Sequence, residues 1–193
     1  MNNIAIFASG SGSNAQRIIE YFNKNRSISV TRIFCNKKDA YVLSRAEKLG
    51  IPTFVFGRNE FYNSNEVLDK LKDDEIDLIV LAGFLWLVPA NILSEFSNRI
   101  INIHPALLPK YGGKSMYGMR VHEAVISAGE KESGISIHYV NEKYDEGEII
   151  FQKKCIVEKD ETPESLSAKI HQLEYEHFPK TIEKLIIKVS LSS

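Results

Sequence analysis

The sequence predicts an α/β fold, with a doubly wound, mostly parallel sheet and an antiparallel excursion near the C-terminus. Three features lead to this prediction. Apolar strand patterns alternate with helical patterns through the first half of the 193 residues, as in sheets built from crossover connections. The run IDLIVLAGF is almost wholly apolar, as a central strand buried on both faces would be. Further along, two strand patterns follow each other with no helix between them.

Each element of the first half has its own signal. Short β-branched or apolar runs predict strands, and runs with apolar residues at helical spacing predict helices. Asp39 is the expected N-cap and Gly50 the expected stop of the second helix, and Pro89 begins the fourth. The expected strands are 3–9, 28–36, 51–56, 76–84 and 99–104, and the expected helices are 13–25, 39–50, 65–75 and 89–96.

The second half predicts the antiparallel excursion and a long terminal helix. A helix is expected at 119–130, then strands at 133–141 and 147–158 joined by the turn EKYDEG. The helix at 162–189 has Thr162 as N-cap and Pro163 at its first position. Pro179 should kink this helix or split it in two, because proline lacks the backbone N–H donor.

Composition and charge exclude several classes of protein. The chain is 44% hydrophobic, which suits one well-packed domain, and its net charge of −1 gives no positive field for nucleic acid or an anionic membrane. Cys35 and Cys155 lie in apolar runs and are expected as reduced thiols, and no zinc-ligand spacing occurs. Because a strand pattern opens the chain, we expect no secretion signal and a cytoplasmic location.

The loop ASGSGSN joins the first strand to the first helix and suits a phosphate group. Glycines let backbone N–H groups approach an anion, and a helix N-terminus adds unsatisfied donors. A tight strand-to-helix turn would use the same glycines, so the loop alone leaves both interpretations open. The residues expected to hold the phosphate are Ser11, Gly12, Ser13 and Asn14.

Two nucleotide-binding motifs fit this loop less well. Gly10-x-Gly12-x-x-Ala15 matches the dinucleotide fingerprint, but Asn36 stands where an acid should hold the ribose. The neighbouring Lys37 and Lys38 leave a 2′-phosphate conceivable. No GK[ST] follows the loop, which excludes a Walker P-loop. A monophosphate on a small substrate is the simplest ligand.

A second candidate site lies at the end of the strand 99–104. Asn102 and His104 are two residues apart in an extended segment, so they point to the same side, at the strand end where open α/β sheets bind ligands. An amide N–H can donate to a developing oxyanion and an imidazole can move a proton near neutral pH. Asp145 is a candidate partner for the histidine, although spacing does not place it there.

The chemistry that this pair suits is attack on a carbonyl through a tetrahedral intermediate. No serine or cysteine stands in a nucleophile-elbow motif, so direct transfer to a bound amine fits better than a covalent enzyme intermediate. We expect structural roles for His122, His171 and His177.

Four stretches resemble a known family: IAIFASGSGSN, VLAGFLWLVP, INIHPALLPKYGG and GISIHYVNEKYDEGEIIFQ. On these the chain resembles the folate-dependent formyltransferases, in particular the phosphoribosylglycinamide formyltransferases (glycinamide ribonucleotide transformylases) of purine synthesis. The resemblance covers nearly the whole length. It implies a Rossmann-like formyltransferase fold and transfer of the formyl group of 10-formyltetrahydrofolate to the glycyl amine of glycinamide ribonucleotide, without a metal.

The resemblance also implies roles for residues. Asn102, His104 and Asp145 match the family's catalytic residues, and Glu174 matches an acid that contacts the substrate ribose. Residues 1–193 would form one domain, with a phosphate-binding half (1–100) and a catalytic and folate-binding half (101–193). The partners would be the two small substrates, with the protein a monomer or homodimer. The implied folate-binding residues are Leu85, Trp86, Leu87, Val88, Val140, Asn141, Glu142, Lys143 and Tyr144.

The sequence departs from the commoner family pattern in three places, one of which is that FYNSNEVLDKL has no arginine to match one that some relatives place near the substrate. Trp86 stands where many relatives have arginine, and the segment 112–120 differs in the wall of the acceptor pocket. An apolar strand end followed by a helix start would also explain Leu85–Val88. The alternatives left open are formyl transfer to a nucleotide sugar or to methionyl-tRNA, a formyltetrahydrofolate hydrolase, and a non-catalytic nucleotide-phosphate sensor.

Overall fold

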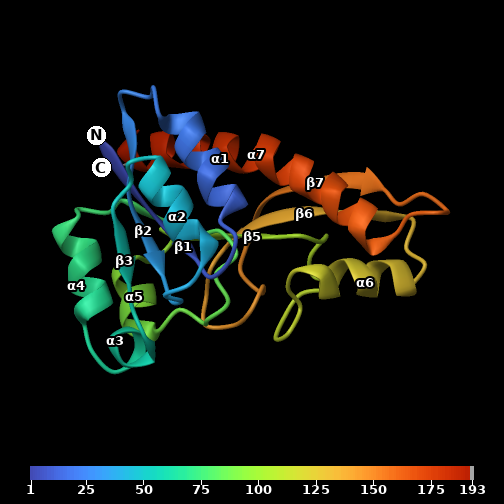
Figure 1. Ribbon diagram of the computed structural model, residues 1–193, viewed down its shortest axis with the longest axis horizontal. Coiled ribbons are helices and arrows are strands. Elements are labelled where there is room, and N and C mark those ends of the chain that lie inside the picture. Colours follow the sequence, from blue (N-terminus) through green and yellow to red (C-terminus); the bar gives the residue numbers. More distant parts are fainter. Residues whose placement is uncertain (192–193) are drawn as a thin grey trace.

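The fold is built on one continuous sheet, as the sequence predicts. The structure is a computed structural model that describes residues 1–191, and its seven strands lie in the order β3-β2-β1-β4-β5-β6-β7 (Figure 1). Pairing is parallel from β3 to β5 and antiparallel between β5, β6 and β7. This confirms the predicted fold class. The strands are β1 (Asn2–Ala8), β2 (Ile28–Cys35), β3 (Thr53–Val55), β4 (Leu78–Leu81), β5 (Ile100–His104), β6 (Glu132–Tyr139) and β7 (Ile149–Ile156).

The helices agree with the sequence pattern apart from three details. The short helix α3 was not predicted. Helix α2 begins after Ala40, with no side-chain cap, so the expected N-cap Asp39 is wrong. Helix α7 continues through Pro179, so it is not split in two. The helices are α1 (Ser13–Phe22), α2 (Tyr41–Lys48), α3 (Arg58–Tyr62), α4 (Glu66–Asp73), α5 (Ala90–Glu95), α6 (Met119–Ser127) and α7 (Pro163–Leu191).

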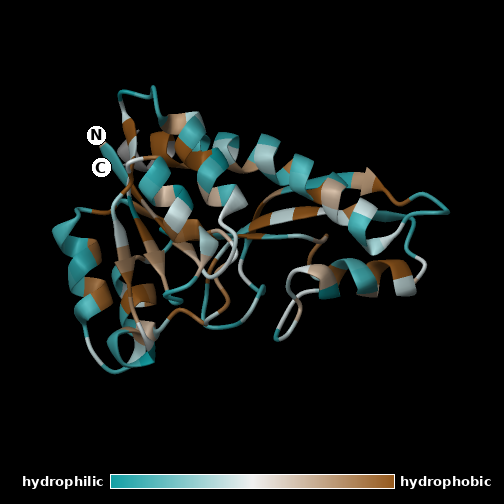
Figure 2. Cartoon of the chain, viewed as in Figure 1, coloured by the Kyte–Doolittle hydropathy of each residue, from teal (hydrophilic) through white to brown (hydrophobic). Residues whose placement is uncertain are grey.

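The apolar core lies in two layers, one on each face of the sheet. One layer packs the sheet against α1, α2, α6 and α7, through side chains such as Ile18, Val125 and Phe178. The other packs it against α3, α4 and α5 and is rich in aromatic rings, with Phe7 stacked on Phe34 at 4.8 Å between ring centroids. Figure 2 shows the apolar colour on the central strands and on parts of the helices that face them. The two layers explain why β4 and residues 4–8 of β1 are apolar throughout.

The strand order places three loops at one edge of the sheet. The chain leaves β1, β4 and β5 at their carboxyl ends, and the strand order reverses between β1 and β4. Ser9 ties two of these loops together, because its N–H donates to Gly83 O (3.0 Å) and its hydroxyl accepts from Leu85 N (3.1 Å). Such an edge is where open α/β sheets bind ligands.

Both cysteines are free thiols. Cys35 is buried at the end of β2, as predicted, whereas Cys155 on β7 is only partly buried. Burial raises the pKa of each thiol. Among the helices of the described part of the chain, none has both the length and the apolar character that crossing a membrane requires.

Candidate functional site

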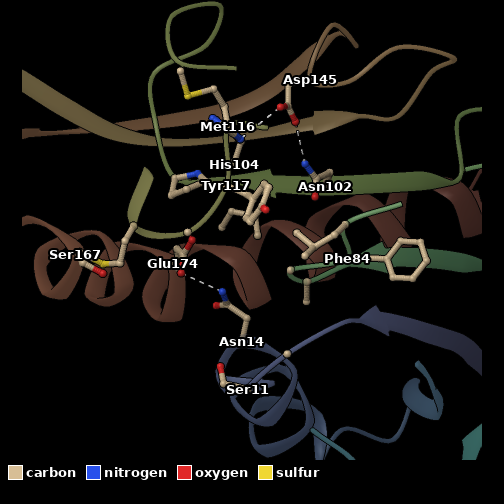
Figure 3. A pocket seen from close by; sticks show the side chains of 18 of the residues that line it. Ser11, Asn14, Phe84, Asn102, His104, Met116, Tyr117, Asp145, Ser167 and Glu174 are labelled. Atoms are coloured by element: carbon tan, nitrogen blue, oxygen red, sulfur yellow. Dashed lines mark hydrogen bonds and ion pairs between the residues drawn. The ribbon is translucent and has the colours of Figure 1, made fainter. Parts of the chain in front are cut away.

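A cavity of about 560 Å³ opens at this edge of the sheet. Loops 10–14, 82–85, 102–105 and 113–119 line it, together with side chains from α6, α7 and the loop before β7. Figure 3 shows Ser11 and Asn14 at one end, Asn102, His104 and Asp145 at the other, and Glu174 between them. One cavity therefore joins the two sites that the sequence indicated separately.

Asp145 is the centre of the polar cluster at the second end. One of its carboxylate oxygens lies 3.5 Å from His104 Nδ1 and accepts a hydrogen bond from Gly113 N (2.9 Å). The other accepts from Asn102 Nδ2 (3.3 Å) and lies 3.5 Å from His138 Nε2. The Asp145 backbone is in the left-handed region, with φ of 56°. Non-glycine residues held there often mark functional sites.

The ionisation of this cluster follows from burial and charge. Burial lowers the pKa of His104, which is 3% exposed, and the negative charge of Asp145 opposes that shift. Burial alone would raise the pKa of Asp145, but its contact with His138, the charge of His104 and the N–H of Gly113 hold that pKa below its usual value. The site therefore pairs an ionised carboxylate with a histidine whose proton is easily lost.

The loop after β5 fixes the tautomer of His104. Its Nε2 lies 2.7 Å from Tyr111 O. Since a carbonyl only accepts, Nε2 carries a proton and Nδ1 faces Asp145. Ser136 holds the start of this loop, because its buried hydroxyl donates to Ala106 O (2.7 Å) and accepts from Leu108 N (2.9 Å). The Leu108-Pro109 peptide bond in this loop is cis.

The first loop has the backbone that an anion site needs. Gly12 is the N-cap of α1 with φ of 74°, and a Cβ there would lie 2.3 Å from Val42 Cγ2. Glycine is thus required both for the left-handed backbone and for close packing on α2. No acidic residue lies in the first turn of α1, so no charge of the helix itself offsets the positive end of its dipole at the cavity.

Glu174 lies beside this loop. It is 4% exposed, and its Oε2 accepts hydrogen bonds from Asn14 Nδ2 (2.9 Å) and from His171 Nδ1 (2.9 Å). The hydrogen bond to Glu174 raises the pKa of His171. The structure thus brings the expected ribose-binding acid next to the expected phosphate loop, although 160 residues separate Asn14 from Glu174.

Three histidines at the site had no predicted catalytic or binding role, although the family resemblance places one of them, His138, beside the site. His122 and His171 line the cavity, and His138 contacts Asn102 Nδ2 at 3.1 Å. A signal existed for His171, three residues before Glu174 on one helix. His122 is 2% exposed and its Nδ1 has no hydrogen-bond partner. His177 does not line the cavity and packs beside Phe151, at 5.1 Å between rings.

The folate-binding candidates divide into two groups. Leu85 and Tyr144 line the cavity, as does most of the variant segment 112–120. Trp86 instead packs against the aromatic core layer, under the guanidinium of Arg58 at 4.9 Å. The other candidates lie on the same two loops but outside the cavity lining: Leu87, Val88, Val140, Asn141, Glu142 and Lys143. Within residues 1–191, no three His, Cys, Asp or Glu side chains are grouped as metal ligands.

Comparison with known proteins agrees with this geometry. Residues 2–182 match the family model described as formyl transferase. The chain is 37% identical to the chloroplastic phosphoribosylglycinamide formyltransferase of Arabidopsis thaliana, over 93% of the chain and 63% of that protein. It is 36% identical to the Bacillus subtilis phosphoribosylglycinamide formyltransferase, over 96% of the chain and 95% of that protein.

Solved structures show the same relationship. The phosphoribosylglycinamide formyltransferase of Streptococcus pneumoniae superposes with a TM-score of 0.85 at 36% identity, over 96% of this chain and 99% of that one. The family-model match, over residues 2–182, includes both ends of the cavity, from the glycine loop to Glu174. Fold, site geometry and full-length similarity agree, and the chain belongs to the formyl transferase family.

Proposed function

We propose that the cavity transfers the formyl group of 10-formyltetrahydrofolate to the glycyl amine of glycinamide ribonucleotide. One observation carries the proposal: a single cavity holds an anion loop at one end and the Asn102–His104–Asp145 cluster at the other (Figure 3). The chain is a phosphoribosylglycinamide formyltransferase of purine biosynthesis, the activity for which its full-length relatives are named.

The proposed reaction is a direct transfer through a tetrahedral intermediate. The neutral amine attacks the formyl carbon, a new C–N bond forms, and the carbonyl becomes an oxyanion. Asn102 and protonated His104 stabilise this oxyanion. The contacts of both groups with Asp145, at 3.3 and 3.5 Å, are longer than good hydrogen bonds, so these donors remain available to a substrate oxygen. The bond to the folate nitrogen then breaks.

The proton must travel from the attacking amine to the departing folate nitrogen. Asp145 supports the positive charge of His104 and accepts or relays the proton, directly or through water. Ser11, Gly12, Ser13 and Asn14 hold the substrate phosphate, and Glu174 binds the ribose. The folate lies against Leu85–Val88 and Val140–Tyr144. Leu85 and Tyr144, exposed by 37% and 38% at the cavity, supply its apolar wall.

The proposal extends to the organisation of the chain. Residues 1–193 act as one domain, in which 1–100 supplies the phosphate loop and 101–193 the catalytic and folate-binding groups. The continuous sheet across both halves supports this. The chain works as a monomer or homodimer, in the cytoplasm, without a metal and without a nucleic-acid or membrane partner.

An assay with and without the acceptor separates this function from its alternatives. We expect the protein to deformylate 10-formyltetrahydrofolate only when glycinamide ribonucleotide is present, with one formylated product per folate consumed. Deformylation without the acceptor would indicate a hydrolase. Turnover only with an amino sugar nucleotide would indicate a sugar-nucleotide formyltransferase, and ribonucleotide binding without any turnover would indicate a sensor.

Asn14→Ala should weaken the acceptor site and leave the folate site unchanged. The substitution removes an amide of the phosphate loop that donates to Glu174. Loss of one hydrogen bond to a charged group predicts a KM for the ribonucleotide that is higher by about 10- to 100-fold. Steady-state kinetics with each substrate varied in turn measures this. Asn23→Ala, at the far end of α1, is the control, and a rise only in the KM for folate would contradict the phosphate-loop assignment.

Ribonucleotide binding should weaken as the pH rises through the titration of His171. Its pKa is raised by Glu174, so the imidazolium persists to higher pH than usual and then loses its charge. The neutral ring no longer offsets the negative charge of Glu174 near the substrate phosphate. Titration calorimetry across this pH range measures the effect. His171→Asn should bind with little pH dependence; an unchanged pH profile in that variant would assign the titration to another group.

A further inference from the structure

His138 carries no role in the reaction described so far, yet both of its ring nitrogens are engaged. It lies near the end of β6 and is 2% exposed. Its Nδ1 lies 2.8 Å from Tyr139 O. A carbonyl oxygen only accepts hydrogen bonds, so Nδ1 carries the proton. In the neutral ring Nε2 then carries a lone pair. Its nearest neighbour is the Asn102 amide nitrogen at 3.1 Å, and Asp145 Oδ1 lies farther away at 3.5 Å.

Two acceptors therefore require the same orientation of the Asn102 amide. One N–H of Asn102 donates to His138 Nε2, and the other points to Asp145, at 3.3 Å. If the amide were flipped, its oxygen would face the His138 lone pair and the Asp145 carboxylate. Both contacts would be repulsive, and burial makes such unpaired contacts costly.

We propose that His138 is a positioning residue that fixes the Asn102 amide so that an N–H, and not the carbonyl oxygen, is presented beside Asp145. This rests on the proposed function, in which Asn102 donates to the oxyanion. The bond to His138 is the shorter of the two, so it anchors the amide, and the longer contact with Asp145 leaves the second N–H to be shared with a substrate oxygen.

The surroundings of His138 keep the ring in place for this task. The β6–β7 pairing shifts register between Ile137 and His138. Gly147, from the loop that carries Asp145, packs so closely that a Cβ there would lie 1.7 Å from Tyr139 O and 3.4 Å from His138 Nδ1. The ring and the Asp145 loop are thus fitted to each other by backbone contact, which limits rotation of the imidazole.

Two substitutions of His138 separate its two hydrogen bonds. In His138→Gln the side-chain amide reaches the position of Nε2 and keeps an acceptor for Asn102, whereas His138→Asn keeps a donor near Nδ1 and offers Asn102 no acceptor. We expect kcat to fall about 10- to 100-fold in His138→Asn and several-fold less in His138→Gln. The KM for each substrate should stay within about threefold of wild type, because this ring does not line the cavity.

A double-mutant cycle tests whether the effect passes through Asn102. In an Asn102→Ala background, His138→Asn should lower kcat several-fold less than it does in the wild-type background, because the amide that it positions is gone and only the 3.5 Å contact of Nε2 with Asp145 Oδ1 is still lost. A loss as large as in the wild-type background would overturn the proposal, as would equal turnover of the Gln and Asn variants. A merely structural histidine would give either of these results.

A measurement on the wild type does not depend on how the variants fold. Nitrogen-15 NMR of the His138 ring should show a protonated Nδ1 and an unprotonated Nε2, coupled to the side-chain NH₂ of Asn102. A proton on Nε2 would reverse the amide and overturn the proposal. The NMR result does not depend on turnover. Failure of the proposed function would appear instead in the transfer assay of the wild-type protein, so the two failures can be distinguished.

Discussion

His104→Ala is expected to lower kcat by at least about 100- to 1000-fold, the loss typical of a positioned oxyanion donor. The ring is 3% exposed, with Nε2 held by Tyr111 O, so only Nδ1 is free to serve the reaction. Alanine leaves the substrate oxyanion with one donor fewer and Asp145 without its partner. Stopped-flow or steady-state assays of formyl transfer, with folding checked by circular dichroism, measure the loss.

His177→Ala is the matched control for this variant. It removes a histidine from α7 that does not line the cavity, and turnover should stay within about twofold of wild type. A folded His104→Ala protein with near wild-type kcat would refute the assignment of His104, whatever the effect on either KM.

Asp145→Asn should lower kcat by about 100- to 10,000-fold, the range for loss of a positioned acid–base group. It should also move the pH profile. Burial lowers the pKa of His104 and the Asp145 charge opposes this, so removing that charge lowers the pKa further. If protonated His104 is the active form, activity is present below that pKa and lost above it. The falling limb of kcat/KM should therefore shift to lower pH.

The direction of this shift is checked by measuring kcat/KM against pH in the wild-type and Asp145→Asn proteins. Asp160→Asn, in the exposed turn before α7, serves as the control and should leave the profile in place. A limb that stays fixed or moves to higher pH in Asp145→Asn would show that Asp145 does not support the charge of His104.

The fold was predictable because its signals are local. The alternation of strand and helix patterns predicts the doubly wound sheet, and the continuous apolar run at β4 predicts its central strand. The errors arise where local signals compete with packing. Helix α2 starts at Tyr41 without a side-chain cap, because packing of its buried face stabilises it. Helix α3 has five residues, too few to show a helical period. Helix α7 continues through Pro179, because the packing of its long buried face stabilises it.

The site was predictable only in part, because its contacts are not local. Spacing along β5 put Asn102 and His104 on one side, and both now contact Asp145. The approach of Asp145 across 43 residues from Asn102 could be anticipated only from the family resemblance. The positioning role proposed for His138 depends on the register of β5 against β6, which pairs it directly with Asn102, and no pattern in the sequence states that register.

A crystal structure with glycinamide ribonucleotide and a non-transferring folate analogue would place both substrates relative to the catalytic residues. We expect the phosphate within hydrogen-bond distance of the backbone of residues 11–14. We also expect the glycyl nitrogen to face the folate beside His104, and an oxygen of the folate analogue to lie near the Asn102 amide. A phosphate bound elsewhere in the cavity, or an amine more than one substrate length from His104, would contradict this arrangement.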